Sequence, residues 1–205
     1  MNKQAKNQHH IYSGDIVAGS LLIPESRAIA SLLKNNLSSE QWHQAVQVNN
    51  ILQKKSPLTS KRQARLIKSR LSLMPEPFLD LVEKSSHEVT TQAILAASIK
   101  HSRLLGDFLD QVVREHWRTF QKKLTNNDWN HFLDLCVQKD PHITSWSEST
   151  FNKLRQVVLR ILAEASYIDG TKTRNLLPVT INAEVREFLI NNGEDYILQC
   201  MEATG

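Results

Sequence analysis

The 205-residue sequence has little cysteine, little glycine and no long hydrophobic run. Cys136 and Cys200 are too few for a disulfide framework, so we expect buried thiols in an intracellular protein. The longest uncharged apolar stretch, residues 89–99, is well short of the roughly 20 residues that cross a bilayer. Residues 1–10 are polar and do not resemble a signal peptide. These absences predict a cytoplasmic protein that does not enter a membrane.

Several enzyme motifs are also absent. There is no glycine-rich phosphate loop, no Cys-x-x-Cys pair and no His-Glu-x-x-His helix. Asp128, His131 and Asp134 recur at helical spacing and could form a metal or acid–base site, but the solvated face of an amphipathic helix explains that spacing more simply. We therefore expect a protein that is not an enzyme, with no catalytic residues, no metal and no cofactor.

Apolar residues recur at the three- and four-residue spacing of amphipathic helices, which predicts an all-α fold. The predicted helices cover residues 24–34, 38–55, 60–74, 78–84, 86–100, 103–123, 128–138, 149–165 and 183–191. A break at residues 124–127 suggests two lobes, an N-terminal one of residues 1–125 and a C-terminal one of residues 126–205. Nothing marks a dimer interface, so a monomer is expected.

Positive charge is concentrated in one part of the chain. No acidic residue lies between Glu40 and Glu76, whereas seven lysines and arginines do. The whole chain carries a formal charge of +4, so the remainder, 4 minus 7, is net negative by 3. Such a concentration is expected of an element that binds a polyanion.

Residues 42–74 have the layout of a helix-turn-helix motif. A capping box at residues 38–41 begins the first helix, and Pro57 interrupts the chain. Thr59 or Ser60 is predicted to cap the second helix, with Gln63 closing a second capping box behind Ser60.

The second helix of this motif has separate apolar and basic faces. Its core stripe is Ala64, Ile67, Leu71 and Met74. The predicted DNA contacts in and beside it are Lys54, Lys55, Thr59, Ser60, Lys61, Arg62, Gln63, Arg65 and Lys68. A solvated charged face remains the alternative.

A second motif of the same kind is predicted near the C-terminus, where residues 128–138 lead through Asp140-Pro141 into residues 149–165. The predicted core stripe of its second helix is Leu154, Val157, Val158, Ile161 and Leu162. Its predicted DNA contacts are Ser149, Asn152, Lys153, Gln156 and Arg160. Residues 167–174 are predicted to form a short hairpin that places Lys172 and Arg174 as a wing. A plain amphipathic helix followed by a surface loop is the alternative.

A further basic stripe recurs at helical spacing in Arg114, Arg118 and Lys122. An ordinary solvated helix face explains it more simply than an extension of the nucleic-acid-binding surface.

The sequence resembles the BrxA-type proteins of BREX phage-exclusion systems, a family formerly of unknown function and labelled as an inner-membrane protein. The resemblance lies in Ser13–Arg27 (SGDIVAGSLLIPESR), Asn49–Arg65 (NNILQKKSPLTSKRQAR) and Lys153–Val157 (KLRQV). It implies an all-helical protein with two helix-turn-helix motifs beside positive surfaces, which binds DNA as an accessory member of a multi-gene defence system. The membrane label finds no support in the sequence, which lacks a spanning segment.

The sequence therefore predicts a non-enzymatic protein of phage defence that binds double-stranded DNA. Two other functions use the same features. The helical faces could bind other defence proteins, which would make the chain an adaptor, or the basic surfaces could bind RNA.

Overall fold

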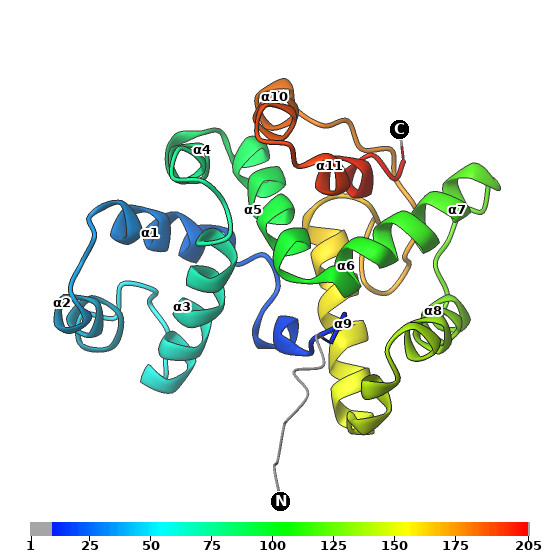
Figure 1. The fold of residues 1–205 in the computed structure, drawn as a ribbon, viewed down its shortest axis with the longest axis horizontal. Helices are drawn as coiled ribbons and strands as arrows, with labels where there is room; N and C mark the ends of the chain where they lie inside the picture. Colours follow the sequence, from blue (N-terminus) through cyan, green and yellow to red (C-terminus); the bar gives the residue numbers. More distant parts are fainter. Residues whose placement is uncertain (1–9, 205) are drawn as a thin grey trace, which may run out of the picture.

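The computed structural model describes residues 10–204, which fold into packed helices (Figure 1). The all-α prediction is confirmed. Within these residues the only β-type pairing consists of two isolated bridges, Lys123 with Asn175 and Ile168 with Leu176. The polar start predicted not to be a signal peptide lies, except for His10, outside the described residues.

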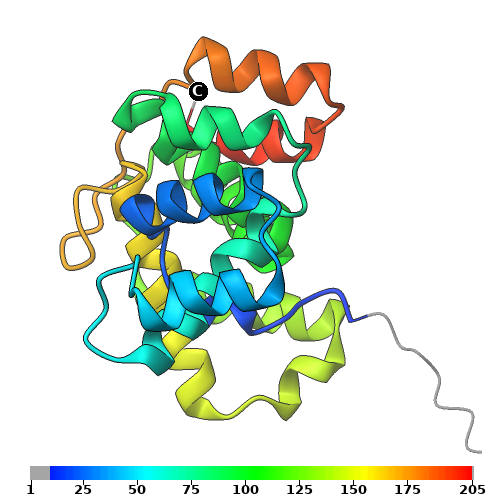
Figure 2. The ribbon, with the colours of Figure 1, turned by 90° about the vertical axis from the view of Figure 1, so that its left-hand side faces the viewer.

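The first part of the chain contains a short 3-10 helix and five α-helices. In chain order they are η1 (Asp15–Ala18), α1 (Ile23–Lys34), α2 (Ser39–His43) with the π-helical turn η2 (Gln44–Val48), α3 (Pro57–Leu71), α4 (Phe78–Lys84) and α5 (His87–His101). Figure 2 shows α10, α4 and α1 in successive layers above α2. The aromatic rings of Phe78 on α4 and Phe188 on α10 lie 5.3 Å apart and join two of these layers.

The second part begins with one long rod. It consists of α6 (Arg103–Phe108), the π-helical turn η3 (Leu109–Val113) and α7 (Arg114–Arg118). It is followed by α8 (Asn126–Lys139), the 3-10 helix η4 (Pro141–Ser145), α9 (Glu148–Glu164), α10 (Ala183–Asn191) and α11 (Asp195–Met201). The rod ends at Arg118, five positions before the predicted end at Lys123, because the chain turns at Phe120 with a positive φ.

The central element is α5, which is buried along its whole middle. Every residue from Val89 to Ile99 is buried, so this helix has no solvated face there. The uncharged stretch recognised in the sequence is therefore a core helix covered by its neighbours. None of the helices in residues 10–204 is long and apolar enough to cross a membrane.

The predicted core stripes are confirmed. Ala64, Ile67, Leu71 and Met74 are buried, as are Leu154, Val157, Val158, Ile161 and Leu162. Cys136 and Cys200 are also buried and free, as expected. One hydrophobic cluster includes residues from Tyr12 to Ala203, and the division into lobes of residues 1–125 and 126–205 stays a prediction.

The boundaries of the helices before and after Pro57 differ from the prediction. The capping box of Ser38 and Gln41 is confirmed by hydrogen bonds of 3.2 and 2.9 Å, but the helix that it begins ends at Val48 instead of Lys55. The next helix begins at Pro57, because proline has no amide hydrogen to lose at a first helical position. The predicted caps at Thr59 and Ser60 are therefore wrong, and both residues lie inside the first turns of α3.

Candidate nucleic-acid interface

Two of the seven lysines and arginines between Glu40 and Glu76 make their contacts inside the fold. Lys54 is half-buried and forms an ion pair with Glu25 on α1. Arg70 is 1% exposed and faces inward from α3. The cations of this segment that reach the surface are Lys55, Lys61, Arg62, Arg65 and Lys68. The exposed positive charge is thus smaller than the sequence total implied, and most of it lies on α3.

The outward face of α3 carries most of the predicted contacts. Lys61, Arg62 and Arg65 are exposed, and the ammonium group of Lys68 lies 4.6 Å from the centre of the Trp42 ring. Thr59 and Gln63 are half-buried. These positions follow the periodicity that places Ala64 and Ile67 in the core.

Ser60 is the exception among the predicted contacts of α3. Its side chain is fully buried, and its hydroxyl donates a hydrogen bond of 2.8 Å to the carbonyl oxygen of Val46. Because α3 begins at Pro57, Ser60 occupies the helix face that packs on η2. We correct the expectation that Ser60 contacts DNA.

The outward face of α9 carries the second predicted set. Ser149, Asn152, Lys153, Gln156 and Arg160 are all exposed. The Ser149 hydroxyl lies 2.8 Å from that of Ser147, the residue that caps the helix. The Nη2 atom of Arg155 lies 3.4 Å from the side-chain oxygen of Asn152. The remaining three side chains have no hydrogen bond or ion pair within residues 10–204.

Side chains of α3 and α9 line one hollow of about 170 Å³. Its floor is the segment 17–22, which includes the end of η1 and lies between the two helices in Figure 1. The polar side chains that line it are Arg62 and Gln63 from α3 and Lys153, Gln156 and Arg160 from α9. We call this the α3–α9 groove. The oxygen of the Gln63 amide is buried there without a hydrogen-bond partner among the described residues.

A second hollow adjoins the groove, and Ala18 and Arg62 line both. Its other charged or titratable lining residues are Asp15, Arg65 and His101. Burial, followed by the nearby charge of Arg70, lowers the pKa of His101, so its imidazole is neutral at physiological pH. Asp15 is the one carboxylate among these lining residues.

The segment from residue 10 to residue 22, which we call the strap, holds α3 and α9 in place. At its end, Arg70 donates hydrogen bonds of 2.6 Å to the Ser20 carbonyl and 3.1 Å to the Gly19 carbonyl. Glu164 of α9 accepts hydrogen bonds from the Ser20 hydroxyl and the Leu21 amide, at 2.8 and 2.9 Å. Residues 19–21 are thus held by hydrogen bonds from both α3 and α9.

The beginning of the strap is held by two buried carboxylates. Asp140 accepts hydrogen bonds from the amides of Ile11 and Tyr12, at 2.8 and 3.1 Å. Burial raises the pKa of Asp140, but hydrogen bonds from backbone amides lower it by more, so the pKa lies below its ordinary value. The Tyr12 hydroxyl donates to Asp107, at 2.7 Å. The strap residues carry part of the resemblance quoted above, but no period or charge pattern predicted their position.

Both predicted helix-turn-helix motifs have longer connections than the usual three or four residues. Residues 49–56 join η2 to α3, and residues 140–147, which contain η4, join α8 to α9. The connections alone do not show whether either pair of helices docks on DNA as a helix-turn-helix motif does. The two helix-turn-helix motifs therefore stay a prediction.

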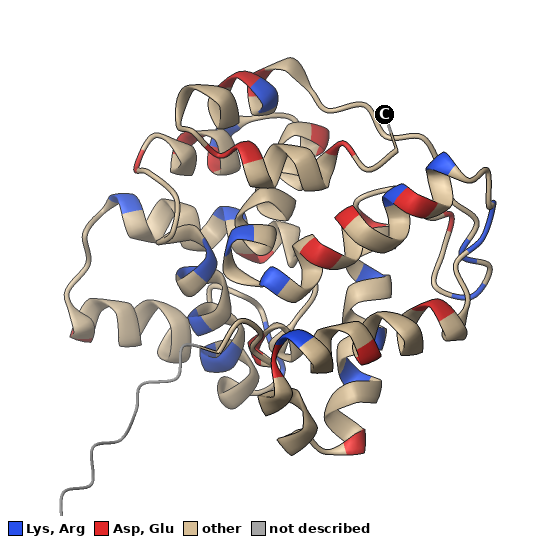
Figure 3. Cartoon of the chain, turned by 45° about the vertical axis from the view of Figure 1, so that its right-hand side comes forward, with Lys and Arg blue, Asp and Glu red and all other residues tan. Residues whose placement is uncertain are grey.

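The predicted wing is a turn without strands. The amide of Asp169 bonds to the carbonyl of Asn175 at 3.0 Å, and that of Leu177 bonds to the carbonyl of Tyr167 at 3.0 Å. Lys172 is exposed at the turn. Arg174 is half-buried and donates to the Thr171 carbonyl and to the Asn126 side chain. Figure 3 shows the basic positions of this turn at the right-hand edge of the molecule.

The remaining candidates from the sequence do not form one site. Arg114 pairs with Asp110 at 3.0 Å, whereas Arg118 and Lys122 are exposed. Asp128 lies 3.2 Å from His116 and serves in the capping box of α8. Among residues 10–204, no three histidine, cysteine, aspartate or glutamate side chains are grouped as metal ligands would be.

The chain is similar to known proteins along most of its length. A profile of the BrxA family matches residues 10–193. The BREX protein BrxA of Paramagnetospirillum magneticum (strain ATCC 700264 / AMB-1) is 44% identical over 94% of this chain and 97% of its own length. The BREX protein BrxA of Escherichia coli O9:H4 (strain HS) is 34% identical over 92% of this chain and 89% of its own length.

A solved structure has the same fold. It is described as the crystal structure of an uncharacterized protein from Magnetospirillum magneticum, and it is 43% identical to this chain. The two align with a TM-score of 0.87 over 94% of this chain and 98% of the other.

Proposed function

The chain belongs to the BrxA family, and from this membership we propose that it is a component of a BREX phage-defence system that binds double-stranded DNA through the α3–α9 groove. In this proposal the protein is not an enzyme. It contacts the duplex and takes part in defence by binding.

The observation that carries the proposal is the meeting of two separately predicted basic faces on one groove. Arg62 of α3 and Lys153 and Arg160 of α9 line the same hollow, although α3 and α9 are far apart in the sequence. Cations on one surface neutralise neighbouring phosphates and displace their counterions. Gln156 is exposed among these cations, and an amide side chain can donate to and accept from base edges.

The closeness of the two helices favours one contact surface. Paired reading helices of helix-turn-helix dimers enter successive major grooves about 34 Å apart. Side chains that line a hollow of about 170 Å³ are much closer than that. We therefore propose that α3 and α9 contact one short stretch of a single duplex.

The test is fluorescence anisotropy of a labelled duplex at several salt concentrations. We expect the triple variant Arg62→Ala, Lys153→Ala, Arg160→Ala to make the slope of log binding constant against log salt concentration shallower by about 2.7. Each phosphate contact contributes about 0.9 to the steepness of that slope. At about 0.1 M salt this corresponds to roughly 500-fold weaker binding if all three groups meet phosphates.

The matched control removes the same charge elsewhere. Lys84 at the end of α4, Lys139 at the end of α8 and Arg186 on α10 are exposed and lie outside the groove. Their triple alanine variant should bind duplex DNA nearly as the wild type does. If both triple variants weaken binding equally, net charge and not the groove decides the affinity, and the proposal fails.

RNA binding would use the same cations, so competition separates the two partners. A protein that reads the wide major groove of B-form DNA should be displaced more readily by duplex DNA than by RNA of the same length. Stronger competition by RNA would replace the proposal with the RNA-binding alternative.

One observation favours a second candidate function, that of a protein adaptor. Leu58 at the start of α3 is 78% exposed and Val48 at the end of η2 is 58% exposed. Exposed apolar residues of this size are typical of protein contacts when they gather on one surface. Defence proteins that co-purify after nuclease treatment, and that are lost in Val48→Ser, Leu58→Ser, would support the adaptor.

A further inference from the structure

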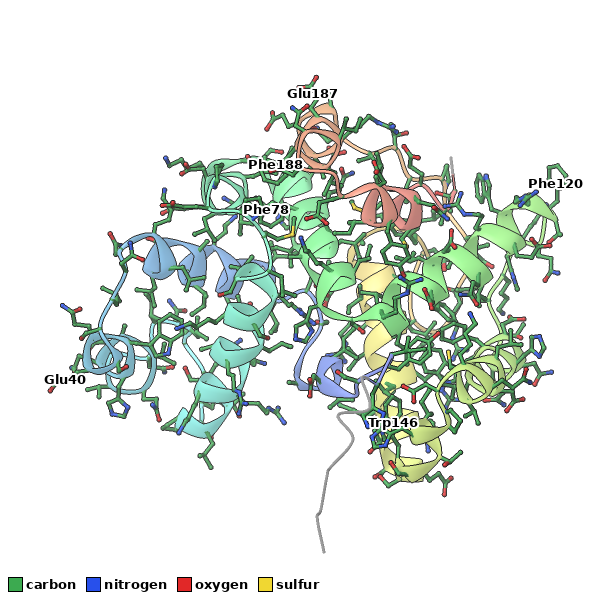
Figure 4. All side chains as sticks on the ribbon, viewed as in Figure 1. Glu40, Phe78, Phe120, Trp146, Glu187 and Phe188 are labelled. Atoms are coloured by element: carbon green, nitrogen blue, oxygen red, sulfur yellow. The ribbon has the colours of Figure 1, made fainter. Side chains whose placement is uncertain are left out.

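Phe120 lies almost completely in solvent at the end of α7. Its side chain is 89% exposed, the largest exposed fraction among the big apolar residues of the described chain. Figure 4 shows it projecting from the right-hand end of the molecule, on the other side from α3. Burial therefore contributes nothing to the choice of phenylalanine at this position.

The backbone at Phe120 also argues against a role in the fold. Its φ is 57°, in the left-handed region that disfavours side chains. The Gln121 amide bonds to the His116 carbonyl at 2.9 Å and the Phe120 amide to the Trp117 carbonyl at 3.2 Å. This is the Schellman motif, in which glycine is the usual residue at the left-handed position.

The end of α10 provides the comparison within this chain. Gly193 has a φ of 67° there. Its amide bonds to the Ile190 carbonyl at 3.1 Å, and the Glu194 amide bonds to the Leu189 carbonyl at 2.9 Å. The same turn is thus made with glycine at one helix end and with an exposed phenylalanine at the other, where glycine would relieve strain.

The surroundings of Phe120 are strongly positive. Two stretches without acidic residues, 116–127 and 170–183, meet there. They are joined by the Lys123–Asn175 bridge and by a hydrogen bond of 2.9 Å from the Leu176 amide to the Lys122 carbonyl. We call the five cations of these stretches the basic corner (Figure 3): Arg118, Lys122, Lys123, Lys172 and Arg174.

None of these five cations forms an ion pair within residues 10–204. The nearest carboxylate of the turn, Asp169, already accepts hydrogen bonds from the Thr173 hydroxyl and from the Asn175 backbone and side chain. These bonds, that of Thr173 first, lower the pKa of Asp169 and keep it occupied within the turn. The charge of the basic corner is therefore not neutralised by a carboxylate of the described residues and is free to meet a polyanion.

We propose that the basic corner binds an unpaired nucleic-acid strand, with one base stacked on the ring of Phe120 and the flanking phosphates beside Lys122, Lys123 and Lys172. An exposed aromatic ring among cations matches the two repeating parts of such a strand, the base face and the phosphate. Bases inside a duplex have no free face to offer, so the partner is a strand with unpaired bases. The inference rests on the proposed function only in taking nucleic acid as the partner, and the residues that bind it here lie outside the α3–α9 groove.

The test measures anisotropy of three labelled probes with the full chain: oligothymidine and oligouridine of about 20 nucleotides and a blunt duplex of similar length. Phe120→Gly should keep or raise the melting temperature because it relieves the left-handed strain. It should weaken binding of the unpaired strands by about 5- to 150-fold, the range for loss of one stacked base. Duplex binding should change by less than about twofold.

Two further substitutions separate stacking from apolar contact. Phe120→Trp retains an aromatic face and should bind the unpaired strands as the wild type does, whereas Phe120→Leu should be as weak as Phe120→Gly. Ile190→Ala removes an apolar side chain that is 53% exposed on α10 and is the matched control, with no expected effect. The oligothymidine and oligouridine arms show whether the strand is DNA or RNA.

The proposal is overturned if Phe120→Gly or Phe120→Leu binds the unpaired strands as tightly as the wild type. The triple alanine variant of the α3–α9 groove distinguishes this proposal from the proposed function, because that variant should lose duplex binding although Phe120 is intact. Each proposal can therefore fail while the other holds.

Discussion

Replacing Arg70 by methionine should loosen the strap from α3 and destabilise the whole protein. Methionine retains much of the apolar length of the side chain but donates no hydrogen bond. The carbonyls of Gly19 and Ser20 then lose their buried partner, and Glu164 alone holds this part of the strap. The substitution thus separates the grip of α3 from that of α9.

The size of the effect follows from two opposing contributions. The guanidinium group makes two hydrogen bonds to carbonyls, and bonds of a charged group are worth about 1.5–3 kcal/mol each. Burial opposes them, because it lowers the pKa of Arg70 to about 10, which corresponds to about 3 kcal/mol of unfavourable desolvation. Its Nε atom has no partner among the described residues. The two contributions leave a net of roughly 0–3 kcal/mol, so we expect a loss of about 2 kcal/mol.

Urea unfolding followed by circular dichroism measures this loss. About 2 kcal/mol should lower the melting temperature by about 4–8 °C in a chain of this size. Lys61→Met on the exposed face of α3 is the control and should change stability by less than about 0.5 kcal/mol. If Arg70→Met is as stable as Lys61→Met, the buried grip on the strap does not contribute to the fold as argued.

Two other predictions concern titration. Asp140→Asn should flatten the decline of stability at acid pH. The pKa of Asp140 in the folded protein lies below its ordinary value. The carboxylate therefore stabilises the fold above the unfolded pKa of about 4, and this contribution is lost as the pH falls through the folded pKa. Melting temperatures between neutral and low pH should therefore converge for the two proteins, and parallel curves would refute the assignment. Burial raises the pKa of Cys136 to about 11 and that of Cys200 to about 12, so neither thiol should react with a thiol reagent at pH ~8 until urea unfolds the chain. Rapid labelling of the native protein would show that the thiols are accessible.

The helices whose ends are marked by proline or glycine could be predicted from the sequence. Residues 78–84 and 183–191 match α4 and α10 at both ends, since Pro77 precedes one helix and Gly193 follows the other. The core stripes of α3 and α9 were also predictable, because a period of 3.6 residues separates the buried and exposed faces of a helix.

The errors come from rules that permit two outcomes. The sequence rules place Pro24 at a first helical position and Pro57 at a break, although both lie in the first turn of a helix. The missing amide of proline is harmless in the first turn and damaging only in the interior. Helix α11 has no counterpart in the prediction, because Glu194 precedes it without a side-chain cap and no proline or capping residue marks its start.

The interface depends on contacts that no local pattern contains. Arginine is rarely buried, so the sequence predicts Arg70 as part of the surface charge. Its partners at residues 19 and 20 are about 50 positions away, and those of Glu164 are more than 140 away. The basic faces of α3 and α9 were foreseeable one at a time, whereas their meeting on a groove required the folded strap.

The strap also determines when the protein can finish folding during its synthesis. The amide of Ile11 pairs with a carboxylate 129 positions later, and the hydroxyl of Ser20 with one 144 positions later. Loops of this length close slowly, and here the later partner leaves the ribosome long after the strap has emerged. A nascent chain that ends before α9 therefore carries the cations of α3 without the groove, so the duplex-binding surface proposed for this protein is completed only after α9 has been made.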